Sequence, residues 1–260
     1  MNNTEGTYQP IIIAHRGYKA KAPENTLPAF HLAVQSKAKG VEFDVWRCGS
    51  GEIVVCHDRD VSLHSNGTGF ITHLPLKKLR EFNFAYHQPK WASKETLPTL
   101  EEVLEVVSPL DFINIEVKSA HFRSFGIEQG LAAILQNHPL RSKITISSFN
   151  PIILSRLKRK LPEIKRGLLL HRRQLPLLSR GFLTWWLKAT SLHPPDYLLS
   201  NTLTLSGHRH GLKIYPYTVN SLEFLKKCVE LRVDGLITDD PDWAEGTLCH
   251  WIGTMTTKKI

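Results

Sequence analysis

The sequence predicts an α/β protein folded as a TIM (β/α)8 barrel, with a small insertion after the second strand. Apolar strand-like and helix-like runs alternate over most of the 260 residues, which is typical of a parallel sheet covered by helices. The length and the 42% hydrophobic content suit one domain spanning 1–260. Charged residues interrupt the apolar runs where strands are expected to end, as in barrels that carry a site at one end.

The first part of the chain contains the start of this alternation. Strands are expected at Ile11–His15, at Val41–Val45 and, after a Gly-Ser-Gly turn, at Ile53–His57. Between the first two, apolar residues from Leu27 to Val34 mark one helical face, and Gly40 ends that helix. The third strand follows the second so closely that the two are expected to form a hairpin.

The segment 58–95 breaks the rhythm. It contains Asn-Gly, proline and several histidines, and it has few clear periodicities. Long irregular segments inside a domain are usually functional or disordered. We expect an insertion with little regular structure.

The alternation resumes at a capping box, Thr99 to Glu102, which opens a helix with an apolar face. A later helix is expected to be capped by Asn220. The further expected strands are Phe112–Val117, Ile144–Phe149, Lys165–Leu170, Tyr197–Ser200, Lys213–Val219 and Gly235–Thr238, and the further expected helices are Ile127–Leu135, Pro151–Leu161, 175–190 and 203–210.

The strand count decides between two architectures. Nine strands are expected, and a TIM barrel has eight places. If Ile53–His57 is only the return arm of a hairpin, the count fits. The alternative is an open doubly wound sheet, but no Gly-x-Gly-x-x-Gly follows the first strand, which disfavours its dinucleotide-binding version.

Charge and cysteine content give weaker indications. The formal net charge of +9 favours anionic partners such as phosphate esters, lipid headgroups or nucleic acid. The four cysteines fit no zinc template and indicate a reducing compartment, with a Cys48–Cys56 pairing left open. The N-terminus lacks the features of a secretory signal, and no stretch approaches the roughly 20 apolar residues of a membrane span. We therefore expect a cytoplasmic protein.

Two surface segments suggest rival partners. Leu175–Leu192, with Trp185 and Trp186, could contact a membrane peripherally, but a barrel helix with an aromatic core face is preferred. The basic run Arg156–Lys160 could contact nucleic acid, but no recognised nucleic-acid motif accompanies it. We expect a solvated barrel helix there and no nucleic-acid partner.

Acidic residues interrupt two expected strands near their carboxyl ends. Glu42 and Asp44 stand two apart, so their side chains point to one face, and Glu116 and Lys118 repeat this spacing. In a barrel these strand ends meet at one end, the barrel mouth. Carboxylates converging there repel one another, and a hard cation relieves the repulsion. All-oxygen ligation predicts one divalent cation, Mg²⁺ or Ca²⁺, on Glu42, Asp44 and Glu116.

Histidines stand at two of the same strand ends. His15 and His57 could form a general acid–base pair on either side of a scissile bond. Arg16 and Lys118 are suited to bind a phosphate anion. Together with the cation these residues predict phosphoryl chemistry. The remaining histidines, His64 among them, receive no catalytic role.

The run AHRGYKAKAPENTLPAF (14–30) resembles the opening signature of the glycerophosphodiester phosphodiesterase family. It is followed at family-like spacing by VEFDV (41–45), IVVCHD (53–58), LPTLEEVL (97–104), INIEVK (113–118), ISSFNP (146–151), YTVN (217–220) and DGLITDDP (234–241). The similarity covers roughly residues 11–241, and the ordered set is far more specific than any single motif. The family fold is a TIM barrel with a small insertion after the second strand.

The resemblance implies roles for individual residues. It implies His15 and His57 as catalytic acid and base, Glu42, Asp44 and Glu116 as metal ligands, and Arg16 and Lys118 as phosphate contacts. Glu24 and Asn25 of the Pro-Glu-Asn-Thr run are secondary candidates, with Asn25 also possible as a plain helix cap. Tyr217 replaces the usual tryptophan before Thr-Val-Asn and is either an aromatic wall for glycerol or a packing residue.

The resemblance implies hydrolysis of a glycerophosphodiester to sn-glycerol 3-phosphate and an alcohol. A lysophospholipase D-like enzyme acting on lipid substrates is the alternative, and a catalytically idle phosphate-binding barrel is a further rival. One departure falls in the insertion, where Leu63-His64-Ser65 replaces the usual Arg-Thr-Thr before Asn-Gly-x-Gly. Left open are the alcohol, the ion, the oligomeric state, which histidine is the acid, and whether water or the glycerol 2-hydroxyl is the nucleophile.

Overall fold

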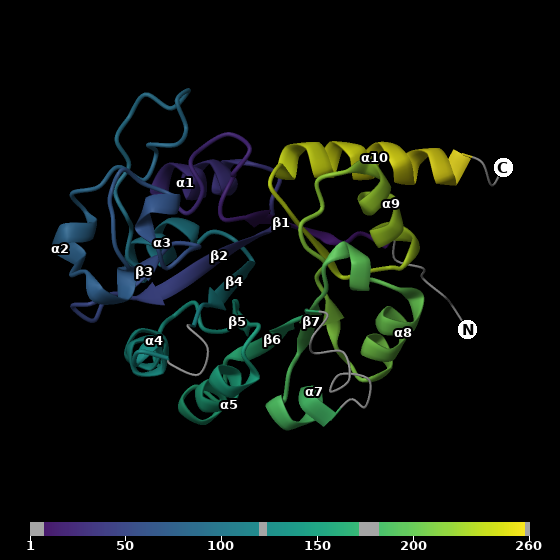
Figure 1. Ribbon diagram of the computed structural model, residues 1–260. Helices are drawn as coiled ribbons and strands as arrows, with labels where there is room; N and C mark the ends of the chain where they lie inside the picture. The colour runs from purple at the N-terminus through teal and green to yellow at the C-terminus, as the bar shows by residue number, and fades with distance from the viewer. Residues whose placement is uncertain (1–7, 120–123, 172–181, 258–260) are drawn as a thin grey trace.

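The chain winds strands and helices alternately around a central barrel, as Figure 1 shows for this computed structural model. The structure describes residues 8–119, 124–171 and 182–257. In Figure 1 the segment after β3 extends to the left of the barrel, and the long C-terminal helix α10 (Pro241–Thr257) lies along the top. The predicted helix at 175–190 falls partly outside the described residues.

Eight parallel strands of the described residues form the barrel. They are β1 (Ile11–His15), β2 (Gly40–Arg47), β4 (Phe112–Val117), β5 (Ile144–Ser148), β6 (Lys165–Leu169), β7 (Ser191–His193), β8 (Lys213–Ile214) and β9 (Gly235–Thr238). Their order is β8-β7-β6-β5-β4-β2-β1-β9. Across the two ends of this order, the N–H of Asp234 donates to the carbonyl of Ile214 at 3.0 Å, and that of Ile237 to Pro216 at 3.1 Å. The predicted TIM barrel is confirmed, and the open doubly wound sheet is excluded.

The remaining strand, β3 (Ile53–Val55), lies outside the barrel and pairs antiparallel with β2. Val45 stands opposite Val55, and Arg47 opposite Ile53. This confirms the hairpin that reconciles nine strands with eight barrel places. The strand ends two residues earlier than predicted, so His57 lies in the loop that follows it.

Helices on the outside of the barrel cover the sheet. They are α1 (Leu27–Gln35), α3 (Leu100–Val107), α4 (Ile127–Leu135), α5 (Pro151–Lys160), α7 (Phe182–Leu187), α8 (Asn201–Arg209), α9 (Leu222–Glu230) and α10. The predicted capping box is confirmed, because the Thr99 hydroxyl accepts from the Glu102 N–H and the Glu102 carboxylate accepts from the Thr99 N–H. The main apolar core lies between these helices and the strands.

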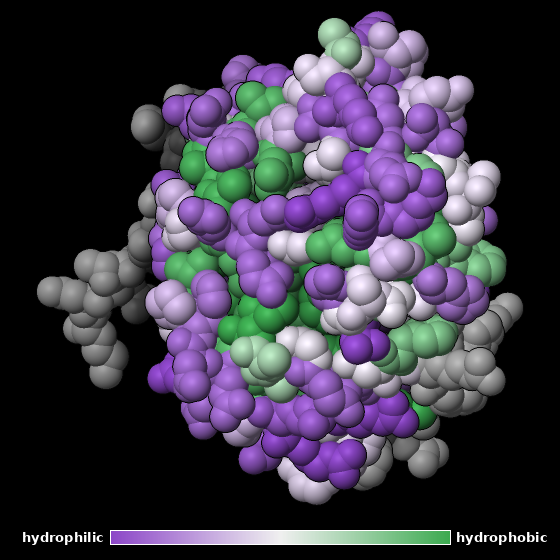
Figure 2. Space-filling view, turned by 90° about the vertical axis from the view of Figure 1, so that its left-hand side faces the viewer, coloured by the Kyte–Doolittle hydropathy of each residue, from purple (hydrophilic) through white to green (hydrophobic). Residues whose placement is uncertain are grey.

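The segment 58–95 contains only single turns of helix: η1 (Val61–Leu63), η2 (Ile71–His73) and α2 (Leu76–Leu79). This agrees with the expectation of little regular structure. The segment nevertheless has its own buried cluster, in which Val61, Ile71 and Leu79 pack against Trp46 of β2. Burial of these side chains holds the segment against the hairpin. Figure 2 shows the face on this side of the molecule, where exposed hydrophobic side chains lie within a mainly hydrophilic surface.

The strand predicted at Tyr197–Ser200 is wrong. The sixth barrel strand, β7, is Ser191–His193, and Asp196–Leu198 forms a 3-10 turn, η4. Two consecutive prolines, Pro194 and Pro195, lie between them. Proline has no N–H to donate to a ladder, so the strand ends at His193 and the apolar run after it turns away.

The helix cap predicted at Asn220 is also wrong. Ser221 is the N-cap of α9, and its hydroxyl accepts from the N–H of Phe224. Asn220 lies one residue earlier and contacts the loop after β9 instead, with its amide donating to Asp239. Helical period alone does not distinguish two adjacent capping residues.

The aromatic core face expected near Trp185 and Trp186 is wrong. Trp185 is 74% exposed and Trp186 37% exposed, whereas Leu183 and Leu187 of α7 are buried. Residues four apart share a helical face, so the leucine pair that faces the core turns both tryptophans toward solvent.

The cysteines are free thiols, which excludes a Cys48–Cys56 disulfide. Cys56 and Cys228 are buried. Among the described residues, no helix is both long and apolar enough to cross a membrane. The cytoplasmic location stays a prediction.

Candidate active site

Parallel strand register brings the predicted site residues to one end of the barrel. His15 of β1 stands beside Glu42 of β2, and Asp44 of β2 beside Glu116 of β4. His15 ends β1 and Glu116 is the last residue but one of β4, and the register places Glu42 and Asp44, from the middle of the longer β2, beside them. The barrel mouth therefore collects them because neighbouring parallel strands run in step.

Three buried carboxylates form the centre of the site. Glu42, Asp44 and Glu116 are at most 7% exposed, and an oxygen from each lies within 4.8 Å of the others. Burial, followed by repulsion from the neighbouring carboxylates, raises the pKa of Glu42 well above its usual value. Burial also raises the pKa of Glu116. Asp44 keeps a lowered pKa, because Lys118 and Arg16 outweigh its desolvation.

Two cations lie against these carboxylates. The Lys118 ammonium contacts Asp44 Oδ1 at 2.9 Å and Glu116 Oε1 at 2.5 Å. Arg16 Nε lies 3.3 Å from Asp44 Oδ2, and its Nη1 donates to Glu24 at 2.7 Å. Both cations are thus paired within the site.

The net charge of this cluster favours the binding of a metal cation. Three carboxylates face two cationic side chains, so a fully ionised cluster keeps one negative charge. Glu24 adds a further carboxylate, which pairs with Arg16 and with Lys19 at 2.7 Å. Hard oxygen donors that lie close together with excess negative charge suit a divalent cation. The donor set fits the predicted acidic metal site.

His15 is held by a carboxylate that the sequence prediction missed. Its Nδ1 contacts Asp239 Oδ1 at 2.5 Å, and its Nε2 faces Glu42 at 3.9 Å. Asn220 fixes Asp239 by donating to Oδ2 at 2.8 Å and accepting from the Asp239 N–H at 3.0 Å. Burial lowers the pKa of His15, partly opposed by its bond to Asp239. The only signal for these two residues was their place in two matched motifs.

His57 has a similar carboxylate partner. Its Nδ1 contacts Asp58 Oδ2 at 2.9 Å, and the indole of Trp46 donates to its carbonyl at 3.1 Å. The N–H of Cys56 bonds to the carbonyl of Asp44 at 2.9 Å, which holds the chain before His57 beside the carboxylates. Burial lowers the pKa of His57, against the opposing charge of Asp44.

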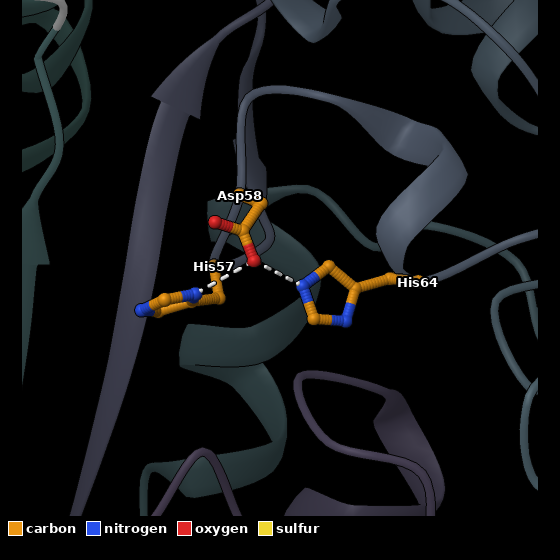
Figure 3. A group of neighbouring side chains, drawn as sticks. All are labelled: His57, Asp58 and His64. Carbon is orange, nitrogen blue, oxygen red and sulfur yellow. Dashed lines mark hydrogen bonds and ion pairs between the residues drawn. The ribbon is translucent and has the colours of Figure 1, made fainter.

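Asp58 is shared with a second imidazole, as Figure 3 shows. His64 Nε2 contacts the same Oδ2 atom at 2.7 Å. The other ring nitrogen, Nδ1, lies 3.6 Å from Glu24. His64 had received no role from the sequence, and the structure places it at the edge of the site.

The secondary candidates Glu24 and Asn25 also lie in the site. Asn25 donates to Asp44 Oδ2 at 3.0 Å and is 4% exposed. The alternative interpretation of Asn25 as a helix cap is wrong, because Thr26 is the N-cap of α1. Asn25 and Arg16 both have positive φ, at 58° and 54°, so the turn between β1 and α1 presents both side chains at the mouth.

Tyr217 lies on the opposite side of the mouth, after β8. Its hydroxyl donates to the carbonyl of Leu170 at 3.1 Å, and its ring packs edge-on against Phe149 at 6.2 Å. A neighbouring cleft of about 400 Å³ includes Glu116, Lys118 and Phe149. Tyr217 is thus partly a packing residue and also lies near the acidic centre.

A barrel with paired carboxylates, anchored imidazoles and cations at its mouth defines a hydrolase built for a phosphorylated substrate. Comparisons with known proteins agree with this class. The pattern of the glycerophosphoryl diester phosphodiesterase family matches residues 15–243. The chain belongs to this family, and it is an enzyme.

Individual relatives extend over almost the whole chain. A glycerophosphodiester phosphodiesterase of Caldanaerobacter subterraneus is 34% identical over 233 residues, covering 89% of this chain and 95% of the relative. One of Bacillus altitudinis is 30% identical, covering 90% and 96%. A solved phosphodiesterase structure from Oleispira antarctica, in complex with the product sn-glycerol 3-phosphate, is 30% identical with a TM-score of 0.82, covering 93% and 98%.

Proposed function

We propose that the protein hydrolyses glycerophosphodiesters to sn-glycerol 3-phosphate and an alcohol, using one divalent cation and two histidines. The observation that carries this proposal is the convergence of two carboxylate-anchored imidazoles with three buried carboxylates at the barrel mouth. The product complex of the Oleispira relative supports the substrate class.

Glu42, Asp44 and Glu116 would hold the cation. All-oxygen ligation favours Mg²⁺ or Ca²⁺. When bound, such an ion neutralises negative charge on the phosphate oxygens. Lys118 and Arg16 already lie against the same carboxylates, so they are positioned to contact an anionic group brought to this centre.

His15 and His57 would move the protons. Each ring is held through Nδ1 by an aspartate, which leaves Nε2 for the reacting groups. Burial lowers the pKa of both rings, so the neutral form that accepts a proton is available near pH 7. The neutral imidazole accepts the proton of the nucleophile, water or the glycerol 2-hydroxyl, on Nε2. The other imidazole must enter the reaction protonated on Nε2, a form that the neighbouring carboxylates favour, and it gives this proton to the leaving alkoxide.

Release of sn-glycerol 3-phosphate from glycerophosphocholine and glycerophosphoethanolamine tests the proposal. The assay is run in EDTA and then with Mg²⁺, Ca²⁺ or Mn²⁺ restored, beside His15→Ala. We expect release that depends on the metal and is lost in the variant. No release with any of the three ions would contradict the proposed substrate class.

The cleft beside Glu116 favours one alternative, a lysophospholipase D-like activity. Phe149, Pro151 and Ile152 give this cleft an apolar side that could take part of an acyl chain. A peripheral membrane contact through Trp185 and Trp186 is disfavoured, because they lie in a pocket with Ala189 and Leu212, near the amino ends of β7 and β8. That is the end of the barrel opposite the mouth. Turnover of lysolipid micelles without turnover of glycerophosphocholine would select the alternative.

A further inference from the structure

One cluster of metal-binding side chains at the mouth differs chemically from the three carboxylates. His57, Asp58 and His64 each point a ligand atom toward the others, as Figure 3 shows, and these atoms lie within 4.8 Å of one another. His57 comes from the loop after β3, and His64 directly follows η1. His64 is also this chain's departure from the family pattern, which usually has threonine in the middle of the Arg-Thr-Thr run.

We propose that His57, Asp58 and His64 form a second cation site, selective for a transition metal such as Zn²⁺, whose occupation inhibits the enzyme. The inhibitory consequence rests on the role proposed above for His57. The binding site itself does not rest on that role, because it is defined by the three side chains alone.

The geometry without metal is close to that of a coordinated site. His57 Nδ1 and His64 Nε2 lie 2.9 and 2.7 Å from the same Asp58 oxygen. Tetrahedral ligands at about 2.0 Å from zinc lie about 3.3 Å from one another. Each of these two distances would therefore lengthen by a few tenths of an ångström on coordination, and the two ring nitrogens already lie within 4.8 Å of each other.

The site is reachable from solvent and has space beside it. The side chains of His57, Asp58 and His64 are 30%, 36% and 20% exposed. A cavity of about 10 Å³, lined in part by His57, His64 and Glu24, adjoins the two rings. A space of this size holds about one water molecule, which is the usual remaining ligand of a zinc ion with three protein ligands.

The donor atoms distinguish this site from the carboxylate centre. Two imidazole nitrogens and one carboxylate suit borderline ions such as Zn²⁺, whereas three carboxylates suit Mg²⁺ or Ca²⁺. The two sites therefore prefer different ions, a hard ion on Glu42, Asp44 and Glu116 and a borderline ion on the histidine pair.

Occupation would remove His57 from proton transfer. A metal on Nδ1 uses the lone pair of that nitrogen, and the ring proton then lies on Nε2. Nε2 can then no longer accept a proton, and the ring can no longer form the imidazolium that would act as an acid. Because the carboxylate centre is untouched, we expect kcat to fall with little change in KM.

Zinc binding in the presence of saturating Mg²⁺ tests the site. Competition with a chromophoric zinc chelator gives affinity and stoichiometry without substrate. We expect His64→Thr, which restores the family residue, to lose one zinc equivalent or to bind it at least tenfold more weakly. The control is His208→Thr, which removes another imidazole paired with a carboxylate, Asp234 at 2.9 Å. This control should bind zinc as the wild type does.

Turnover measured with the same proteins tests the inhibition, each variant being compared with its own zinc-free rate. Zinc should inhibit wild type and His208→Thr and should spare His64→Thr. His64→Gln, with thermal unfolding of each variant, provides a second substitution in case one folds poorly. Equal zinc affinity in wild type and both His64 variants would overturn the site, and His64-dependent binding without inhibition would overturn the regulatory role. His64-dependent binding in a protein with no phosphodiesterase activity would contradict only the proposed function.

Discussion

The two proposed catalytic histidines are held in the same way but in different surroundings. His15 and His57 each bind an aspartate through Nδ1, at 2.5 and 2.9 Å. The partner of His15, Asp239, follows the last barrel strand and is fixed by the neutral amide of Asn220. The partner of His57 is the next residue in the chain, and it is shared with an ionisable imidazole of the 58–95 segment.

The two proposed proton carriers therefore differ in how firmly the fold holds them. The side chain of His15 is 12% exposed, and that of His57 is 30% exposed. The first pair depends on the parallel pairing of β1 with β9, which lie against the main core. The second depends on a segment packed by its own smaller cluster. External ions can therefore reach the second pair more readily than the first.

Removing the imidazole ring of either His15 or His57 should have the largest effect on kcat. We expect His15→Ala and His57→Ala each to lower kcat by about 10²–10⁴, because general acid–base catalysis contributes this much. KM should change little. Steady-state kinetics on glycerophosphocholine measures both parameters, with His208→Ala as the control. A variant that keeps kcat within tenfold of wild type would exclude that histidine as a proton carrier.

Replacing each aspartate by a neutral asparagine should lower kcat by different factors in the two His–Asp pairs. Partners that orient a functional side chain typically contribute 10–100-fold, and we expect about 100-fold from Asp239→Asn and about tenfold from Asp58→Asn. An amide at 239 places its own N–H₂ group against the donors of His15 or Asn220, whereas water can replace part of the lost contact at the more exposed Asp58. Comparison of kcat gives the ratio, and equal losses would refute the proposed difference.

A third histidine, His193, is fully buried and shows what burial does without a carboxylate. His193 of β7 is fully buried, with Nε2 bonded to Ser191 at 2.9 Å, and its Nδ1 has no hydrogen-bond partner among the described residues. Desolvation lowers its pKa from 6.5 to about 3.

This pKa predicts how stability depends on pH. Between pH 6.5 and about 3 the unfolded chain binds a proton at His193 that the folded chain does not bind. The stability due to neutral His193 is thus present above pH 6.5 and is lost as pH falls, by about 1.4 kcal/mol per pH unit. Urea unfolding at pH 7, 5.5 and 4.5 should show a shallower decline in His193→Gln than in wild type. An identical decline would contradict the assignment, and His208→Gln is the exposed control.

Asn220→Ala should have the smallest effect. It removes the amide that orients Asp239 but leaves the contact between Asp239 and His15. A hydrogen bond is worth about 1 kcal/mol, so we expect about a fivefold loss of kcat without a change in KM. Asn220→Gln, with its longer side chain, should recover little. Full activity of Asn220→Ala would mean that His15 alone fixes Asp239.

Much of the fold could be predicted because it depends on local pattern. The apolar runs of β1, β2, β4 and β9 and the capping box at Thr99 were found where the sequence indicated them. The sequence-based prediction was wrong where one or two residues changed the local structure. Pro194 and Pro195 ended β7 before the apolar run at Tyr197, and Ser221 rather than Asn220 capped α9.

The sequence by itself determined the barrel, the family and the acidic strand residues Glu42, Asp44 and Glu116. Their spacing and their place in the motifs follow from strand period and order. Only the tertiary structure decided which side chains support the histidines. Asp239 lies 224 residues from His15, and His64 meets Asp58 through an irregular turn. Such contacts depend on barrel closure and on loop packing, and neither leaves a periodic signal in the chain.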